Sequence, residues 1–266
     1  MQIIIWTISP IGTKSNQMAK KERIQILSAN IQGALHRTKN MPCQDCYASK
    51  VNKNKLVAIV SDGAGSAKYG KIGARIICDT LCDLLIRSDF KNIRQNVTEA
   101  INVARQKLIL HRRNKSKSAG GIMDFSATVI GVFCIKNKGV FFHIGDGAGL
   151  AFYQGQSDDF VISEPANGAF SCETFFYTMS DWQDNLRFTF FENANRIMLM
   201  TDGVTDFVFA DDFYKIRQKF LFPIINYLEQ EPDKTAAQKA LCNTLNDSRA
   251  QRINADDKTL VWVKMP

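Results

Sequence analysis

Three apolar segments of this chain end at an aspartate followed by glycine. They read VAIVSDGAG over residues 57–65, FFHIGDGAG over 141–149 and IMLMTDGVTDF over 197–207. An Asp-Gly pair is a common turn signal, because glycine readily adopts positive φ and aspartate tolerates it. A hairpin turn also needs a strand close on both sides, and only the second segment has one. The turn explanation therefore covers one of the three.

A fourth acidic segment, NADDKTLVWV over residues 254–263, carries its carboxylates before an apolar strand. If that strand runs antiparallel to the others, Asp256 or Asp257 reaches the same edge as the three Asp-Gly ends. Carboxylates packed together there would repel one another unless some bind protons or a cation lies among them. Mg²⁺ and Mn²⁺ prefer oxygen ligands, and glycine lets a backbone carbonyl approach an ion. The pattern predicts a site for a divalent cation.

The elements that must position these carboxylates alternate in type along the chain. Strands are expected over residues 23–35, 55–62, 126–135, 139–146, 149–153, 187–191, 196–200 and 258–264. Helices are expected over 69–88, 91–113, 211–230 and 235–251, and the first two have apolar residues at helical spacing. Many strands covered by pairs of helices are typical of an α+β domain.

The domain organisation follows from what the chain lacks. No Pro-, Gly- or Ser-rich linker divides it, so residues 1–266 are predicted to form a single domain. Residues 155–185 are irregular and polar, and we expect them to form a flap or insertion rather than core. Ser126 and Thr128 are expected to belong to a strand that supports the site.

Composition indicates a soluble globular protein in the cytoplasm. Apolar residues make up 45% and charged residues 23% of the chain, which are ordinary values. No segment approaches the length of about 20 apolar residues that a membrane span needs, so no membrane partner is expected. The N-terminal segment lacks the basic region of a signal peptide. Seven scattered cysteines in a chain of this size favour reduced thiols, hence a cytoplasmic location.

The charge balance is basic, with 34 basic against 26 acidic residues. The basic residues gather over 14–23 and 111–118, where no aromatic residues are interleaved and no nucleic-acid-binding signature occurs. Solvated loops explain these clusters better than nucleic-acid binding does, so no nucleic-acid partner is expected. A modest attraction for phosphorylated substrates would follow from the net charge. Nothing in the sequence fixes the oligomeric state.

Taken in order, the motifs QD, SDGAG, SAT, IGDG, TDGVTD and DDKT resemble those of metal-dependent serine/threonine phosphatases of the protein phosphatase 2C type, the PPM family. The resemblance runs from about residue 28 to the end of the chain. It is closest to a bacterial branch whose first motif has the form G-x-x-H … P-C-Q-D. The matching residues are Gly33, His36, Pro42, Cys43, Gln44 and Asp45. The segment GAFSCETFFYT over 168–178 also resembles this branch.

The resemblance implies a β-sandwich of two antiparallel sheets flanked by helices on both sides. Two metal ions, Mn²⁺ or Mg²⁺, would lie at one end of the sandwich. Asp62 would bridge both ions, and the carbonyl of Gly63 would bind the first. Asp202 and Asp256 would bind the second, while Asp45 would hold metal-bound water.

Further positions follow from the same resemblance. Asp146 and Asp206 match positions that bind a weaker third ion in some members. Asp206 comes four residues after Asp202, so on a helix both face the same way. The arginine that contacts the substrate phosphate in this family has no aligned counterpart here. His36 and Arg37 are the nearest candidates for that contact.

The chain departs from the family pattern at several positions. Ala64 stands where well-studied members have a histidine regarded as a general acid, and Gln44 replaces a glutamate. The second Asp-Gly continues with Gly147 and Ala148 in place of serine and arginine. Asp257 stands where asparagine is usual. These departures bear on protonation of the leaving group and on the charge of the site.

The implied function is hydrolysis of phosphoserine and phosphothreonine in protein substrates. A metal-bridging hydroxide would attack the phosphorus in line, without a covalent intermediate. The alternative is a pseudophosphatase, inactive or weakly active, that serves as a regulatory binding module. All the principal metal aspartates are intact, which favours the enzyme. An enzyme acting on small phosphoesters would use the same site, and the sequence leaves that alternative open.

Overall fold

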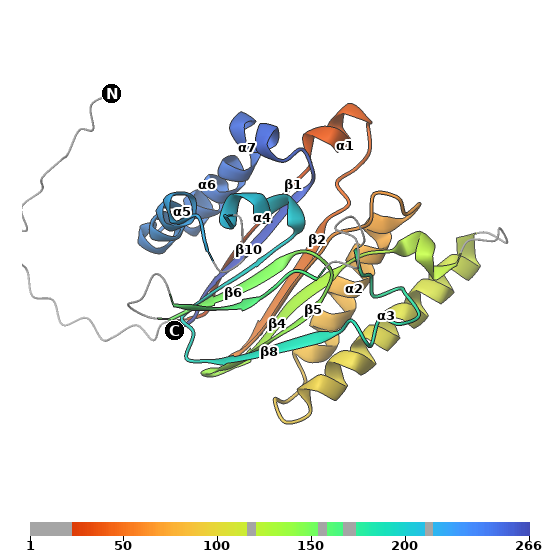
Figure 1. Ribbon diagram of the computed structural model, residues 1–266. Coiled ribbons are helices and arrows are strands. Elements are labelled where there is room, and N and C mark those ends of the chain that lie inside the picture. The colour runs from red at the N-terminus through yellow and green to blue at the C-terminus, as the bar shows by residue number, and fades with distance from the viewer. Residues whose placement is uncertain (1–22, 116–120, 154–158, 167–173, 211–214) are drawn as a thin grey trace, which may run out of the picture.

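The computed structural model describes residues 23–115, 121–153, 159–166, 174–210 and 215–266, and these form a sandwich of two sheets between two helical layers (Figure 1). Both sheets are antiparallel and five-stranded. One has the order β1 (Gln25–Ile31), β10 (Lys258–Lys264), β9 (Arg196–Met200), β6 (Ala148–Phe152) and β7 (Phe160–Ser163). The other has the order β2 (Cys46–Asn52), β3 (Lys55–Ser61), β4 (Val129–Ile135), β5 (Lys138–Ile144) and β8 (Arg187–Glu192).

The strands in the middle of each sheet are buried on both faces, because each sheet packs on its partner and on helices. In β3, Leu56, Ala58 and Val60 face the other sheet, whereas Val57 and Ile59 face the helices. This double burial explains the continuous apolar sequence of the strand, where one-sided burial would give alternation. The predicted sandwich flanked by helices on both sides is confirmed.

The helices α2 (Gly70–Leu85) and α3 (Ile93–Lys115) cover the sheet that contains β3. The helices α5 (Gln218–Gln230) and α6 (Lys234–Asn246) cover the other sheet. Shorter helices lie at the strand ends: α1 (Ala34–Thr38), η1 (Ile122–Phe125), α4 (Asp202–Val208) and α7 (Ser248–Ile253). Among the described residues, no helix combines the length and apolar character needed to cross a membrane.

Some predicted boundaries of helices and strands were wrong. The first predicted strand ends at Ile31, and α1 follows because the N–H of Leu35 donates to the carbonyl of Ala255 across the molecule. The helix predicted over 235–251 divides at Asp247, whose carboxylate accepts the N–H of Arg249 and caps α7. The helix predicted over 211–230 begins only at residue 218, and its first four positions lie outside the described residues.

Two parts of the predicted flap over 155–185 belong to the core instead. Residues 160–163 form β7, which pairs with β6. Tyr177 and Trp182 are buried against α2 and α3, and the Tyr177 hydroxyl donates to the Gly73 carbonyl at 2.9 Å. The side chain of Arg105 on α3 also donates to the carbonyl of Tyr177 at 2.5 Å. Residues 167–173 of the predicted flap lie outside the described residues.

Candidate metal centre

Strand direction brings the predicted aspartates to one end of the sandwich. β3 and β5 are both antiparallel to β4 and so run the same way, which places Asp62 and Asp146 at the same edge. β10 runs antiparallel to β9, which is the direction that the sequence argument required, so the segment before β10 meets the segment after β9. Asp256 and Asp202 lie in these two segments, each two positions from its strand, and Asp45 immediately precedes β2.

The pKa values of these carboxyls are shifted by burial and by one another's charge. Burial is the largest cause that raises the pKa of Asp62, and the negative charges of Asp45, Asp256 and Asp146 raise it further, to well above the ordinary value. Burial, followed by the charges of Asp62, Asp146 and Asp256, likewise raises the pKa of Asp202. Burial raises the pKa of Asp45 to about 7, although its interactions with the side chains of Asp62 and Thr201 oppose the shift.

Asp45 is held by residues of the opposite sheet. The Thr201 hydroxyl donates to Asp45 Oδ2 at 2.8 Å and accepts the N–H of Thr259 at 3.0 Å. The Asn30 amide donates to the Asp45 carbonyl at 3.2 Å and to Thr259 Oγ1 at 2.9 Å. The second carboxylate oxygen, Asp45 Oδ1, is buried and has no hydrogen-bond donor among the described residues.

Asp62 is fixed by its main chain. Its N–H donates to Thr128 Oγ1 at 3.0 Å, and its carbonyl accepts the N–H of Thr128 at 2.9 Å. This pair confirms that Thr128 supports the site. The Gln44 amide nitrogen, in the orientation that gives it acceptors, donates to the Gly63 carbonyl at 2.8 Å and to the Ala64 carbonyl at 3.1 Å. A carbonyl has two lone pairs, so Gly63 keeps one for another partner.

The two carboxylate oxygens of Asp146 differ in their hydrogen bonding. Thr174 donates its hydroxyl to Asp146 Oδ2 at 2.6 Å. Asp146 Oδ1 is buried and, among the described residues, lacks a donor. Burial raises the pKa of this carboxyl, and the charge of Asp256 adds to the shift. Thr174 lies in the segment 168–178 that resembles the bacterial branch, but the sequence analysis assigned it no role.

The residues present fit divalent cations. Carboxylates from both sheets crowd together, and two of their oxygens are buried without donors in the described part of the chain. Burial makes their negative charge costly unless a cation compensates it. Only oxygen atoms are offered, which are the ligands that Mg²⁺ and Mn²⁺ prefer.

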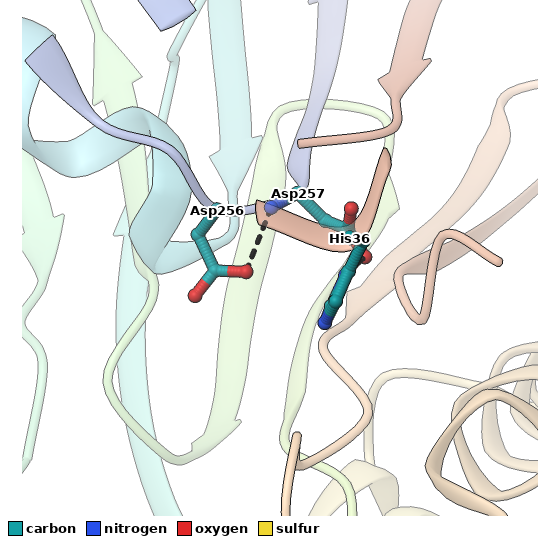
Figure 2. Close-up of side chains that lie close together, drawn as sticks. All are labelled: His36, Asp256 and Asp257. Carbon is teal, nitrogen blue, oxygen red and sulfur yellow. Dashed lines mark hydrogen bonds and ion pairs between the residues drawn. The ribbon is translucent and has the colours of Figure 1, made fainter. Parts of the chain in front are cut away.

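Asp257 has a different role from its neighbour Asp256 (Figure 2). Asp257 Oδ1 accepts the N–H of Gly33 at 2.7 Å. Asp257 Oδ2 accepts the N–H of Gln44 at 2.6 Å and lies 2.7 Å from His36 Nδ1. One ligand atom from each of His36, Asp256 and Asp257 lies within 4.8 Å of the others. Both oxygens of Asp257 are taken by nitrogen donors. Among the described residues, the Asp256 carboxylate accepts only the N–H of Asp257, at Oδ1 and 2.8 Å (Figure 2), so these contacts favour Asp256 as the metal ligand.

The turn that carries Asp256 is fixed by a buried lysine. Lys258 is fully buried, and its Nζ donates to the carbonyls of Asn254 at 2.6 Å and Asp256 at 2.8 Å. The first turn of α4 presses against the same segment, because a Cβ atom at Gly203 would lie 1.8 Å from the Asp257 carbonyl oxygen. No sequence pattern distinguished Lys258 from an ordinary surface lysine.

Two predicted site residues lie at the margin. Asp206 is exposed, and its Oδ2 accepts the Asn254 amide at 2.9 Å. Arg37 is exposed, and its guanidinium donates to the side chain of Asn246 on α6 at 3.3 Å. His36, in contrast, is 6% exposed and faces Asp257. The structure thus brings together Asp45, Asp62, Asp146, Asp202 and Asp256, with His36 beside them.

A family model for protein phosphatase 2C matches residues 32–246. No curated protein sequence is significantly similar to the chain. Among solved structures, serine/threonine phosphatase Stp1 from Staphylococcus aureus has a TM-score of 0.61 at 14% identity, over 96% of this chain and 100% of that chain.

Two further solved structures contain metal ions. The catalytic domain of the serine threonine protein phosphatase PstP, in complex with two manganese ions, has a TM-score of 0.61 at 15% identity, over 91% of this chain and 97% of that one. RsbX in complex with magnesium has a TM-score of 0.56 at 14% identity, over 94% and 99%. At these identities the likeness concerns the fold.

Proposed function

We propose that this chain, which belongs to the protein phosphatase 2C family, is a metal-dependent phosphatase that hydrolyses phosphoserine and phosphothreonine in proteins. The observation that carries the proposal is the carboxylate cluster at the end of the sandwich, with raised pKa values and buried oxygens that have no donor in the described part of the chain. Membership of the bacterial branch with the G-x-x-H … P-C-Q-D motif is part of the proposal, as is a cytoplasmic location, which the free cysteines among the described residues suit.

Two divalent cations, Mn²⁺ or Mg²⁺, would be held by Asp62, the Gly63 carbonyl, Asp202 and Asp256, with Asp146 and Asp206 available to a weaker third. When bound, such cations supply positive charge that activates water and neutralises the phosphoryl group. Asp45 Oδ1, which has no donor among the described residues, can accept a hydrogen bond from the attacking water. No side-chain nucleophile is required, so no covalent intermediate is expected.

Positive charge near the phosphoryl group would come from His36 or Arg37, the two candidates in the first motif. His36 lies beside Asp257 and is nearly buried, whereas Arg37 is engaged with Asn246. The contacts therefore support His36 over Arg37 for binding the substrate phosphate.

The test is hydrolysis of a phosphothreonine peptide and of a small chromogenic phosphomonoester, each with Mn²⁺, with Mg²⁺ and with chelator. We expect turnover that requires metal and that Asp62→Asn and Asp202→Asn abolish. Asp79→Asn, an exposed change on α2, is the matched control and should leave turnover intact. Activity only on the small ester would overturn the assignment to protein substrates. A folded protein without turnover on either substrate would be a pseudophosphatase.

A further inference from the structure

Asp257 joins three separate parts of the first motif to the last strand. Its carboxylate accepts the N–H of Gly33, the N–H of Gln44 and a hydrogen bond with His36, all at 2.6 to 2.7 Å. The side chain is 1% exposed. The partners lie between 213 and 224 residues away in the sequence. One carboxylate therefore holds both ends of the segment from Gly33 to Gln44, and Asp45 follows this segment directly.

The geometry requires an aspartate at this position. A carboxylate has two acceptor oxygens, and here the Gly33 N–H uses one while the Gln44 N–H and His36 use the other. Asparagine has a single acceptor oxygen, and its NH₂ group would face an N–H donor in either orientation. The departure from the usual asparagine at Asp257 and the presence of His36 in the first motif are thus explained together.

His36 is held by one nitrogen and open at the other. Nδ1 bonds Asp257 Oδ2, while Nε2 has no hydrogen-bond partner among the described residues. One ring nitrogen also lies within 4.8 Å of an Asp256 carboxylate oxygen. In Figure 2 the ring extends past Asp257 on the side toward which the Asp256 carboxylate points. In the imidazolium form both nitrogens are donors, so Nε2–H can bind a phosphoryl oxygen beside the metal ligands.

We propose that Asp257 is a positioning residue that aims His36 at the phosphoryl group of the substrate, so that His36 serves where the family uses an arginine. The inference rests on the proposed function. Neighbouring cations are committed elsewhere, since Lys258 donates to backbone carbonyls and Arg37 to Asn246. A cation site made of His36, Asp256 and Asp257 fits less well, because nitrogen donors already occupy both Asp257 oxygens.

The direct test is long-range ¹H–¹⁵N NMR of the imidazole rings, with Mg²⁺ present and inorganic phosphate as the probe. The chain has only three histidines, which makes assignment by substitution simple. We expect a proton on His36 Nδ1 before phosphate is added, and a shift of the Nε2 resonance when phosphate binds. His143, which is fully buried and bonded to Ser163 at 3.0 Å, is the internal control and should not respond.

Kinetics test the same inference independently. His36→Gln should raise KM for a phosphomonoester about 10-fold or more with a smaller effect on kcat, and His36→Arg should recover part of the loss. Asp257→Asn should raise KM similarly and remove the fixed Nδ1 proton. If Asp257→Asn does not fold, the His36 variants and the NMR titration still decide.

Failure of this inference differs from failure of the proposed function. An active, metal-dependent phosphatase whose His36 resonances ignore phosphate, or whose KM is unchanged in His36→Gln, overturns the role of His36 alone. A protein without turnover whose His36 Nε2 responds to phosphate keeps the binding role and loses the enzymatic one. Loss of both signals overturns both.

Discussion

The acidic residues at the end of the sandwich fall into two groups that differ in what surrounds their carboxylates. The inner group, Asp45, Asp62 and Asp202, is crowded by like charges, which together with burial raise its pKa values. In the outer group, Asp206 and Asp257 accept hydrogen bonds from nearby nitrogens. The same residue type therefore ties chain segments together in the outer group and carries uncompensated charge in the inner group. Uncompensated charge marks the functional part of the site.

The largest expected effect comes from breaking the inner group. Asp62→Asn should lower kcat by at least ~10³-fold, equivalent to about 4 kcal/mol of barrier, because the site loses its central carboxylate. In chelator the variant should be more stable than the parent, because it removes a buried carboxyl whose charged form burial and the neighbouring carboxylates disfavour. Turnover assays and urea denaturation measure the two effects. A metal-free variant less stable than the parent would contradict the comparison.

Breaking the outer group should have the opposite effect on stability. Asp257→Ala leaves the buried N–H groups of Gly33 and Gln44 without an acceptor. We expect a loss of about 3 kcal/mol in the free energy of unfolding, with or without metal. Urea denaturation in chelator measures it beside the exposed Asp79→Asn. Stabilisation by Asp257→Ala would show that this carboxylate belongs with the inner group.

The pH dependence of the metal-free protein sharpens the contrast. The pKa of Asp45 is about 7 in the folded state and near 3.8 when unfolded, so the folded state binds this proton more tightly. Its contribution to stability is complete below pH about 4 and is lost as pH rises through about 7. We expect the free energy of unfolding of the metal-free protein to fall as pH rises from about 4 to about 7, and that of Asp45→Asn to fall less. Urea midpoints at several pH values check this, and an equal loss in both proteins would contradict it.

A smaller effect is expected at the boundary between the groups. Thr174→Val removes the donor to Asp146 Oδ2 and leaves that carboxylate free to turn. Loss of one such bond corresponds to about 1 kcal/mol, so the metal concentration for half-maximal activity should rise about fivefold with kcat at saturating metal nearly unchanged. Thr174→Ser, which keeps the hydroxyl, is the matched control. An equal change in both variants would assign the effect to lost packing.

The sequence predicted features that depend on neighbouring residues and missed those that depend on residues far apart along the chain. Apolar strands that end at Asp-Gly predicted β3 and β9 and the aspartates after them, because pattern and position are local. The edge strand β2 was missed, since none of its side chains is fully buried and it lacks an apolar run. The hydrogen bond between His36 and Asp257 joins residues 221 positions apart, and no local pattern specifies it. Thr201 and Lys258 likewise matter only through partners in space.

The aspartates of the candidate metal centre do not come from one sheet. Asp45 and Asp62 adjoin strands of one sheet, Asp202 and Asp256 adjoin strands of the other, and Asp146 lies between β5 and β6, which belong to different sheets. A chain whose sheets had formed but not yet docked would contain no complete site, so cation binding would report the last step of assembly. Once bound, cations would cross-link the two sheets through their carboxylate ligands. Separation of the two sheets would then require release of the cations, so the same cations would also slow unfolding of the protein.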